Sequence, residues 1–228
     1  GAVSKQDIVI GLGLSLPTIT QNLNNLAELG LIDTSKKISN TGGRNATAYS
    51  YIEKARYAVG LYLNRHHINC VAVDLSGNVI SLIRVRENFD LNDDNYLRKI
   101  GETVEEVKKD TGLSDDRFLG VGIAVQGLIS DDGERVTYGL TLNFTGVTRA
   151  DIAKYIPYHN RLFHDSAAAG YAEVWDRNDL DDAFYLSLSN SVGGAVIVAN
   201  KIFEGERRKS GEIGHMTIIP KAGDRCYC

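Results

Sequence analysis

The chain has 228 residues, of which 43% are hydrophobic and 24% are charged, and its formal net charge is −4. This balance excludes a disordered chain and allows a sizeable core, in one large or two smaller domains. No apolar run is long enough to cross a membrane, and the first residues lack the pattern of a signal peptide, so we expect a cytoplasmic protein. Three cysteines, with Cys70 far from the other two, do not form a disulfide framework.

Charge is distributed unevenly along the chain. Residues 1–56 contain six Lys or Arg and four Asp or Glu, a net charge of +2, which leaves −6 for the remaining 172 residues. This asymmetry predicts a domain boundary near residue 56. The net positive charge of residues 1–56 also makes this part better suited than the acidic remainder to lie against a polyanion.

Two short helices joined by a tight turn are expected in the first part. Ser4 is placed to cap a helix that ends near Leu12, and Gly13 suits the turn that follows. Ser15 is placed to cap a second helix, with Pro17 in its first turn.

The second helix is expected to be amphipathic. Ile19, Leu23 and Leu26 recur at helical spacing, which predicts that they face a core. Hydrogen-bonding side chains occupy the other face, namely Thr18, Gln21, Asn24 and Asn25.

A short hairpin follows the second helix. Residues 31–32 and 48–52 are expected as strands on either side of a polar tip that contains residues 42–44, Gly-Gly-Arg. Helix, turn, helix and hairpin together form a winged helix-turn-helix pattern, which we expect over residues 1–56. An alternative is a pair of helices that serves only protein contacts.

The winged helix interpretation assigns candidate DNA contacts. The second helix would lie in a DNA major groove, where amides pair with adenine edges and a Thr methyl contacts thymine. The tip of the hairpin would reach the backbone or the minor groove. The candidate DNA-binding residues are Thr18, Thr20, Gln21, Asn24, Asn25 and Arg44.

From residue 57 onward the pattern becomes that of an α/β protein. Strands and helices are expected in the order βββαβαβα over residues 56–63, 67–75, 78–85, 95–110, 118–125, 148–156, 160–165 and 166–175. A second set of strands is expected over residues 183–203, as though the first arrangement began again. The predicted domains after residue 56 are therefore 57–182 and 183–228.

The most specific motif lies at the end of the chain. Residues 211–215 read GEIGH, and Cys226 and Cys228 follow with one residue between them. With these motifs the chain resembles the ROK family of repressors, open reading frames and sugar kinases. The resemblance implies the actin-like ATPase (ribonuclease H-like) fold of sugar kinases, with two α/β lobes around a sugar cleft. The second lobe would be incomplete in this chain, and a winged helix would precede the first.

Neutral His and Cys thiolates are the donors that Zn²⁺ prefers. The resemblance implies a structural zinc ion bound by His215, Cys226 and Cys228, with a fourth ligand beyond residue 228. The alternative is a pair of free thiols. Cys70 lies within an expected strand, which favours a buried apolar role.

The resemblance also implies a sugar site. Asp165 in the stretch HDSA matches the family's catalytic aspartate, and His164 stands where the family has asparagine. Glu212 and His215 match the sugar-contacting residues of GEIGH. Two further candidates come from loops, Gly127 and Asn143. The alternative for Asp165 is a simple helix N-cap.

Kinase activity would need phosphate-binding loops. The family's kinases have the motif DxGGTK in the first hairpin, where this chain reads Leu-Tyr-Leu-Asn-Arg-His with Tyr62 in place of the acid. The second glycine loop keeps only Gly193 and Gly194. Phosphoryl transfer depends on positioning and charge stabilisation, so we expect no enzyme activity.

The sequence therefore predicts a sugar-responsive transcriptional regulator that acts as a repressor. Its expected partners are operator DNA, a monosaccharide or derivative as effector, and further copies of itself in a homodimer or higher homo-oligomer, with no membrane. A ROK sugar kinase with degenerate phosphate loops is the alternative, and a scaffold protein without DNA is a third.

Overall fold

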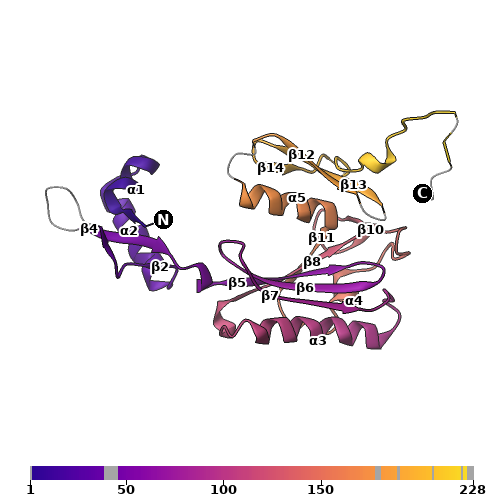
Figure 1. Ribbon diagram of the computed structural model, residues 1–228, viewed down its shortest axis with the longest axis horizontal. Helices are drawn as coiled ribbons and strands as arrows, with labels where there is room; N and C mark the ends of the chain where they lie inside the picture. Colours follow the sequence, from indigo (N-terminus) through magenta and orange to yellow (C-terminus); the bar gives the residue numbers. More distant parts are fainter. Residues whose placement is uncertain are drawn as a thin grey trace. The chain divides into compact units, whose positions relative to one another are not determined.

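The computed structural model describes residues 2–38, 46–177, 181–188, 191–206, 208–221 and 223–224. The chain divides into two compact units (Figure 1). The first contains residues 1–57 with the segments 74–78 and 115–118, and the second contains the remainder. The division lies next to the boundary expected near residue 56, whereas the boundary expected after residue 182 lies within the second unit.

Two helices and a small antiparallel sheet form the first unit. The central strand is β4 (Ala46–Tyr51), and its three partners are β1 (Val3–Ser4), β2 (Ile32–Asp33) and β3 (Lys37–Ile38). The helices are α1 (Lys5–Leu12) and α2 (Leu16–Glu28). Both predicted caps are confirmed, because the hydroxyls of Ser4 and Ser15 accept the backbone N–H three residues on.

The core of the first unit is narrow. Ile19 and Leu23 of α2 are buried, as predicted, and so is Ala48 of β4. The prediction that Leu26 also faces a core is wrong, since its side chain is 37% exposed. Leu29 is exposed as well, so the apolar contacts of α2 end before its last turn.

The second unit contains most of the chain. Its strands and helices follow one another as β5 (Tyr57–Leu63), β6 (His67–Asp74), β7 (Val79–Arg86), α3 (Asp94–Asp110), β8 (Phe118–Val125), β9 (Leu128–Ile129), β10 (Val136–Tyr138), α4 (Arg149–Ile152), β11 (Asn160–His164), α5 (Asp165–Asp176), β12 (Ala183–Leu188), β13 (Val192–Val198) and β14 (Lys201–Phe203). The second unit also contains the single 3-10 turn η3 (Ile213–His215), whereas the turns η1 (Glu53–Ala55) and η2 (Asp115–Arg117) belong to the first unit. No helix among the described residues is both long and apolar enough to span a bilayer.

The elements of the second unit stack in layers. The five-stranded sheet has the order β11-β8-β5-β6-β7, with α3 on one face and α5 on the other (Figure 1). A second sheet, in the order β12-β13-β14, packs on the opposite side of α5. Strand alternation buries Leu61 and Leu63 of β5 completely and turns Tyr62, which is half-buried, to the other face of the strand.

Two elements within the second unit also differ from the sequence prediction. The helix expected over residues 148–156 is a single turn, α4, which Thr148 and Asp151 start with a capping box. Pro157 disfavours a helical conformation at Ile156, so the chain cannot stay helical through the end of the expected range. The β9–β10 hairpin was not predicted, because its strands have only two and three residues.

Candidate functional site

One pocket of the second unit brings together five of the six candidate sugar-binding residues. Its walls come from the end of β11, the start of α5, the loop after β8, the start of β13 and the segment that contains η3. The five candidates that line it are Gly127, His164, Asp165, Glu212 and His215. We call it the Asp165 pocket.

Asn143 is the exception. The described lining of the pocket does not include it, and its side chain is exposed. Its backbone has a φ of 54°, in a turn where its N–H donates to the carbonyl of Leu140 at 3.2 Å. The sugar-binding role of Asn143 stays a prediction.

The junction of β11 and α5 places His164 and Asp165. Parallel pairing sets His164 beside Val125 at the end of β8, so the loop after β8 opens at the same edge of the sheet. Asp165 then begins α5. His164, not Asp165, occupies the N-cap position, and its side chain makes no capping hydrogen bond. Asp165 is therefore not the N-cap residue of α5, and the alternative in which it serves only as a helix N-cap is wrong.

The carboxylate of Asp165 is largely enclosed. Its Oδ1 accepts the backbone N–H of Ser166 at 2.8 Å and lies 3.4 Å from Nε2 of His164. Burial raises the pKa of Asp165, and the charge of His164 and the hydrogen bonds from Ser166 oppose that rise. Such a group is a strong hydrogen-bond acceptor that costs free energy to keep ionised.

Two glycines dock the GEIGH segment on β13. A Cβ on Gly211 would overlap the carbonyl oxygen of Gly194, and a Cβ on Gly214 would overlap that of Val192. Only glycine allows this approach. It brings Glu212 and His215 to the Asp165 pocket, with Nε2 of His215 3.6 Å from Oε2 of Glu212.

Tyr62 and Gln126 support the pocket from the sheet. Nε2 of Gln126 donates to the hydroxyl of Tyr62 at 3.4 Å. Burial raises the pKa of Tyr62, and the nearby charge of Asp165 raises it further. Gln126 was not predicted as a site residue, although its position directly after a buried strand and before Gly127 is a usable signal.

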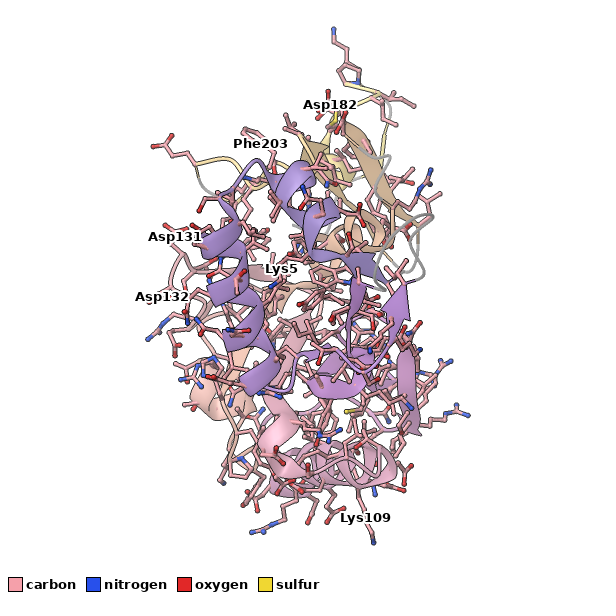
Figure 2. The ribbon with its side chains drawn as sticks, turned by 90° about the vertical axis from the view of Figure 1, so that its left-hand side faces the viewer. Lys5, Lys109, Asp131, Asp132, Asp182 and Phe203 are labelled. Atoms are coloured by element: carbon pink, nitrogen blue, oxygen red, sulfur yellow. The ribbon has the colours of Figure 1, made fainter. Side chains whose placement is uncertain are left out.

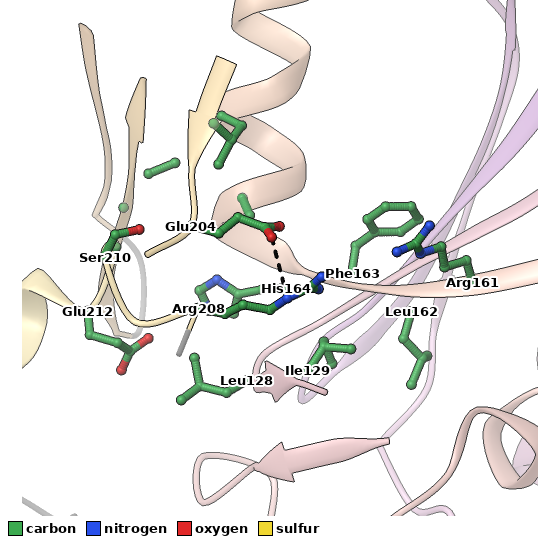
Figure 3. Close-up of a pocket in the computed structure, with 15 residues that line it drawn as sticks. Leu128, Ile129, Arg161, Leu162, Phe163, His164, Glu204, Arg208, Ser210 and Glu212 are labelled. Atoms are coloured by element: carbon green, nitrogen blue, oxygen red, sulfur yellow. Dashed lines mark ion pairs between the residues drawn. The ribbon is translucent and has the colours of Figure 1, made fainter. Parts of the chain in front are cut away.

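A second pocket adjoins the Asp165 pocket and shares Leu128, His164 and Glu212 with it (Figure 3). Arg208 lies in this pocket and pairs with Glu204 at 3.4 Å and with Asp131 at 3.3 Å. Asp131, in the loop after β9, lies at the surface (Figure 2). The guanidinium of Arg208 is therefore already held by two carboxylates.

The candidate DNA contacts on α2 separate into two groups. Thr18, Gln21, Asn24 and Asn25 are exposed, and Nε2 of Gln21 donates to Oδ1 of Asn25 at 2.9 Å. Thr20 is half-buried; its hydroxyl donates to the carbonyl of Leu16 and accepts from Nζ of Lys5. Thr20 therefore serves packing between α1 and α2 in addition to any role on DNA.

Three predicted site residues lie outside the described residues: Arg44, Cys226 and Cys228. The described part of the chain contains no group of three side chains placed to hold a metal ion. Cys70 is buried, and burial raises the pKa of its thiol to about 12, which agrees with an inert apolar role.

A model described as the ROK family matches residues 58–228. The chain belongs to the ROK family. The xylose repressor of Bacillus subtilis (strain 168) is 25% identical over 222 residues, which cover 95% of this chain and 56% of that protein. The DNA-binding transcriptional dual regulator NagC of Escherichia coli (strain K12) is 23% identical over 250 residues, which cover 100% of this chain and 56% of NagC. This ROK chain thus spans little more than half the length of these curated relatives.

Solved structures show the same fold. A ROK family transcriptional regulator, described as a homologue of the E. coli MLC protein, has a TM-score of 0.77 at 21% identity and covers 99% of this chain and 58% of its own. The ROK hexokinase of Thermus thermophilus has a TM-score of 0.60 at 23% identity. The similarity covers 75% of this chain and 56% of the hexokinase chain. This chain has the mixed α/β fold that ROK regulators share with ROK sugar kinases.

Proposed function

We propose that this ROK protein is a sugar-responsive transcriptional regulator that represses from operator DNA. Residues 1–56 would bind DNA as a winged helix, and the Asp165 pocket would bind a monosaccharide or derivative. Relatives that are named as sugar repressors support this class, as does the likeness to a ROK regulator along 99% of the chain. The proposal includes a cytoplasmic location and a homodimer, since operators commonly contain two symmetric half-sites.

The observation that carries the sugar-binding part is the convergence of two carboxylates and two imidazoles in one pocket. The carboxylates of Asp165 and Glu212 are suited to accept hydrogen bonds from the hydroxyl groups of a sugar. A hydroxyl or carboxylate that lacks a hydrogen-bond partner in a closed site costs free energy. Segments distant in sequence supply the polar groups of the pocket, among them the loop after β8, the β11–α5 junction and the η3 segment.

The surface of α2 supports the DNA-binding part. Gln21 and Asn25 form an exposed amide pair, joined by a hydrogen bond. An exposed amide is suited to the paired acceptor and donor of an adenine edge. The helix carries no Lys or Arg, so phosphate contacts would come from other parts of the first unit.

Tyr62 supports the absence of phosphoryl transfer. It occupies the strand position at which the family's kinases have an acid beside phosphate-binding glycines, and its half-buried side chain lies close enough to Asp165 for that carboxylate to raise its pKa. Asp165 is retained, which is the one observation in favour of a sugar kinase with degenerate loops. A radiolabelled ATP assay on the complete protein distinguishes the two: a regulator yields no sugar phosphate.

A structural zinc ion is a further part of the proposal. His215 has a carboxylate neighbour, Glu212, and such a neighbour commonly fixes the ring of a zinc-bound histidine. Cys226 and Cys228 would supply thiolates, and a fourth ligand would lie beyond residue 228. The ion would tie the η3 segment to the residues that follow it.

The experiment that tests the proposed function is a thermal-shift screen of the complete protein against monosaccharides. A ligand that binds only the folded state raises the melting temperature. We expect stabilisation by one sugar or a small related group, and loss of that stabilisation in an Asp165→Ala variant. Stabilisation by no sugar, together with no sequence preference in an operator selection, would contradict the proposal.

A further inference from the structure

We propose that an apolar groove on the five-stranded sheet is filled by an amphipathic α-helix from the part of the complete protein outside residues 1–228. The groove lies between the flank of α5 and the face of β5, β6 and β7 that is turned toward α5. We call it the sheet groove. Its described lining shares no residue with that of the Asp165 pocket, so the inference does not depend on sugar binding.

The floor of the sheet groove consists of small side chains. Gly60 of β5, with Gly122 and Ala124 of β8, lies on the sheet side, and Ala167 and Ala168 form the wall on α5. Together with larger apolar neighbours they enclose a volume of about 720 Å³. Glycine within a strand commonly marks a place where another element approaches the sheet closely.

Large apolar side chains surround this floor and are exposed. Leu82 of β7 and Tyr171 of α5 line the groove with 66% and 54% of their surface exposed, and Phe163 of β11 is exposed as well. Trp175 follows Tyr171 by one helical turn, with 6.4 Å between the two ring centres. A continuous apolar surface of this kind on a globular unit marks a place where another element packs.

The two faces of the five-stranded sheet are covered unequally. On one face α3 packs against β7, and on the other α5 packs against β11 and the second sheet (Figure 1). The side chains of β7 that share the face of Leu82 are Arg84 and Arg86, and all three are exposed. Sheets of α/β proteins are normally covered by helices on both faces, so a covering element is expected over β5, β6 and β7.

The uncovered strip has the width of one helix. Neighbouring strands lie about 4.8 Å apart, so two strand spacings separate β5 from β7 by roughly 10 Å. An α-helix with its side chains is about 10 to 12 Å wide. A helix seated over β6 would therefore lie beside α5 and cover Leu82 and Tyr171.

The edge strand β7 gives the sheet groove a basic rim. Within the described residues, neither Arg84 nor Arg86 forms an ion pair with a carboxylate. Nη2 of Arg84 lies 3.3 Å from each ring nitrogen of His67. Desolvation lowers the pKa of His67, and the charges of both arginines lower it further, so the ring is neutral at pH 7. Charge complementarity therefore calls for Asp or Glu on the flank of the helix next to β7.

The length of the relatives favours a helix from the same protein. The xylose repressor and NagC match 95% and 100% of this chain, yet the match covers 56% of each relative. The rest of each relative has no counterpart in residues 1–228. A helix joined covalently to the sheet has a high effective concentration at the groove, which a separate protein lacks.

Hydroxyl-radical footprinting of the complete protein tests whether the groove is filled. Tyr51 of the first unit is the control for an open ring, since it is 54% exposed like Tyr171, and the buried Tyr57 gives the rate of a covered ring. We expect Tyr171 and Trp175 to be labelled at rates closer to that of Tyr57, at every protein concentration. Labelling of Tyr171 as fast as that of Tyr51 would overturn the proposal. Protection that disappears on dilution would also overturn it, by assigning the groove to a second copy.

A photo-cross-linker at position 82 identifies the occupant. With p-benzoylphenylalanine in place of Leu82 in the complete protein, we expect a cross-link within one protomer to a peptide outside residues 1–228 that contains Asp or Glu. A cross-link to a second copy, to another protein or back to residues 1–228 would contradict the proposal, as would a peptide without acidic residues.

A pair of variants on β7 provides an independent readout. Leu82→Asp places a charge in the sheet groove, whereas Val79→Asp changes a side chain of similar exposure, 62%, that is not part of the described lining. If a helix covers the groove, Leu82→Asp lowers the melting temperature of the complete protein and Val79→Asp leaves it close to that of wild type. Equal melting temperatures of wild type and both variants would show that the groove is open and would contradict the proposal.

Discussion

The imidazole of His164 and the carboxylate of Asp165 face each other across 3.4 Å at the point where β11 ends and α5 begins. Burial raises the pKa of this carboxyl, and the charge of the imidazole offsets only part of the rise. Ionisation of Asp165 in the folded protein therefore lowers the free energy of unfolding.

Replacement of Asp165 by Asn should stabilise the protein at neutral pH. Because the pKa of Asp165 is raised in the folded state, folding favours the protonated form, and the penalty for ionisation is fully present above the folded pKa. It disappears as the pH falls below the unfolded value of about 3.9. We expect the melting temperature to rise by roughly 2 to 4 °C for each kcal/mol relieved.

Melting curves of both proteins from pH 7 down to pH 4 check this prediction. The gain in the Asn variant should shrink as the pH falls. A variant that is less stable than wild type at pH 7 would show that the ionised carboxylate stabilises the fold, which is the opposite of the effect expected from its burial.

Gly211→Ala should displace the GEIGH segment. The added methyl group meets the backbone carbonyl of Gly194, which cannot rotate away, so we expect destabilisation of about 1 to 3 kcal/mol and weaker effector binding. Gly11→Ala is the matched control, because nothing lies within 4 Å of the added Cβ and alanine favours helix α1. Urea unfolding and effector titration measure both effects. Effector binding at wild-type strength in Gly211→Ala would mean that the docking does not position Glu212.

Much of the second unit could be predicted from sequence, since regular alternation identified the strands β5 to β8 and helical spacing identified α3. The composition of the pocket was predictable only through the family's motifs. Nothing local indicates that Glu212 lies with Asp165, because their proximity depends on β13 and on the close contact of Gly211 with Gly194. Leu26 fits its helical pattern and is still exposed, since periodicity does not reveal where a core ends.

Gln21→Ala should relax the choice of base at one operator position. Loss of a paired amide contact typically costs about 1 to 3 kcal/mol of discrimination, and here it would also release Asn25 from its hydrogen bond. A selection from random operators, carried out with the complete protein, measures the preference at each position. The control is Gln6→Ala, an exposed amide on α1, for which we expect an unchanged preference. The same change in both variants would argue against base reading by α2.

Arg44→Ala tests the hairpin tip. It should weaken binding to all operator sequences alike and reduce the dependence of binding on salt, because a phosphate or minor-groove contact carries little sequence information. Affinity measured at several salt concentrations checks this. An unchanged salt dependence would exclude the tip from the interface.

Zinc should be lost when a proposed ligand is removed. In the complete protein we expect His215→Ala and Cys226→Ser to lose stoichiometric zinc, and to melt at a lower temperature because metal binding is coupled to folding. His66→Ala, an exposed histidine in the turn between β5 and β6, should retain the metal. Elemental analysis of purified protein provides the measurement. Zinc at full occupancy in both ligand variants would rule out this site.

The measurement that tests the central claim most directly is a titration of operator DNA into the complete protein, with and without the sugar found by the thermal-shift screen. A regulator requires that sugar change operator affinity by some factor, and linkage then requires that operator change sugar affinity by the same factor. We expect equal factors in the two directions, and no such change in Asp165→Asn, whose operator affinity without sugar should equal that of wild type. Sugar binding that leaves operator affinity unchanged would contradict a sugar-responsive regulator.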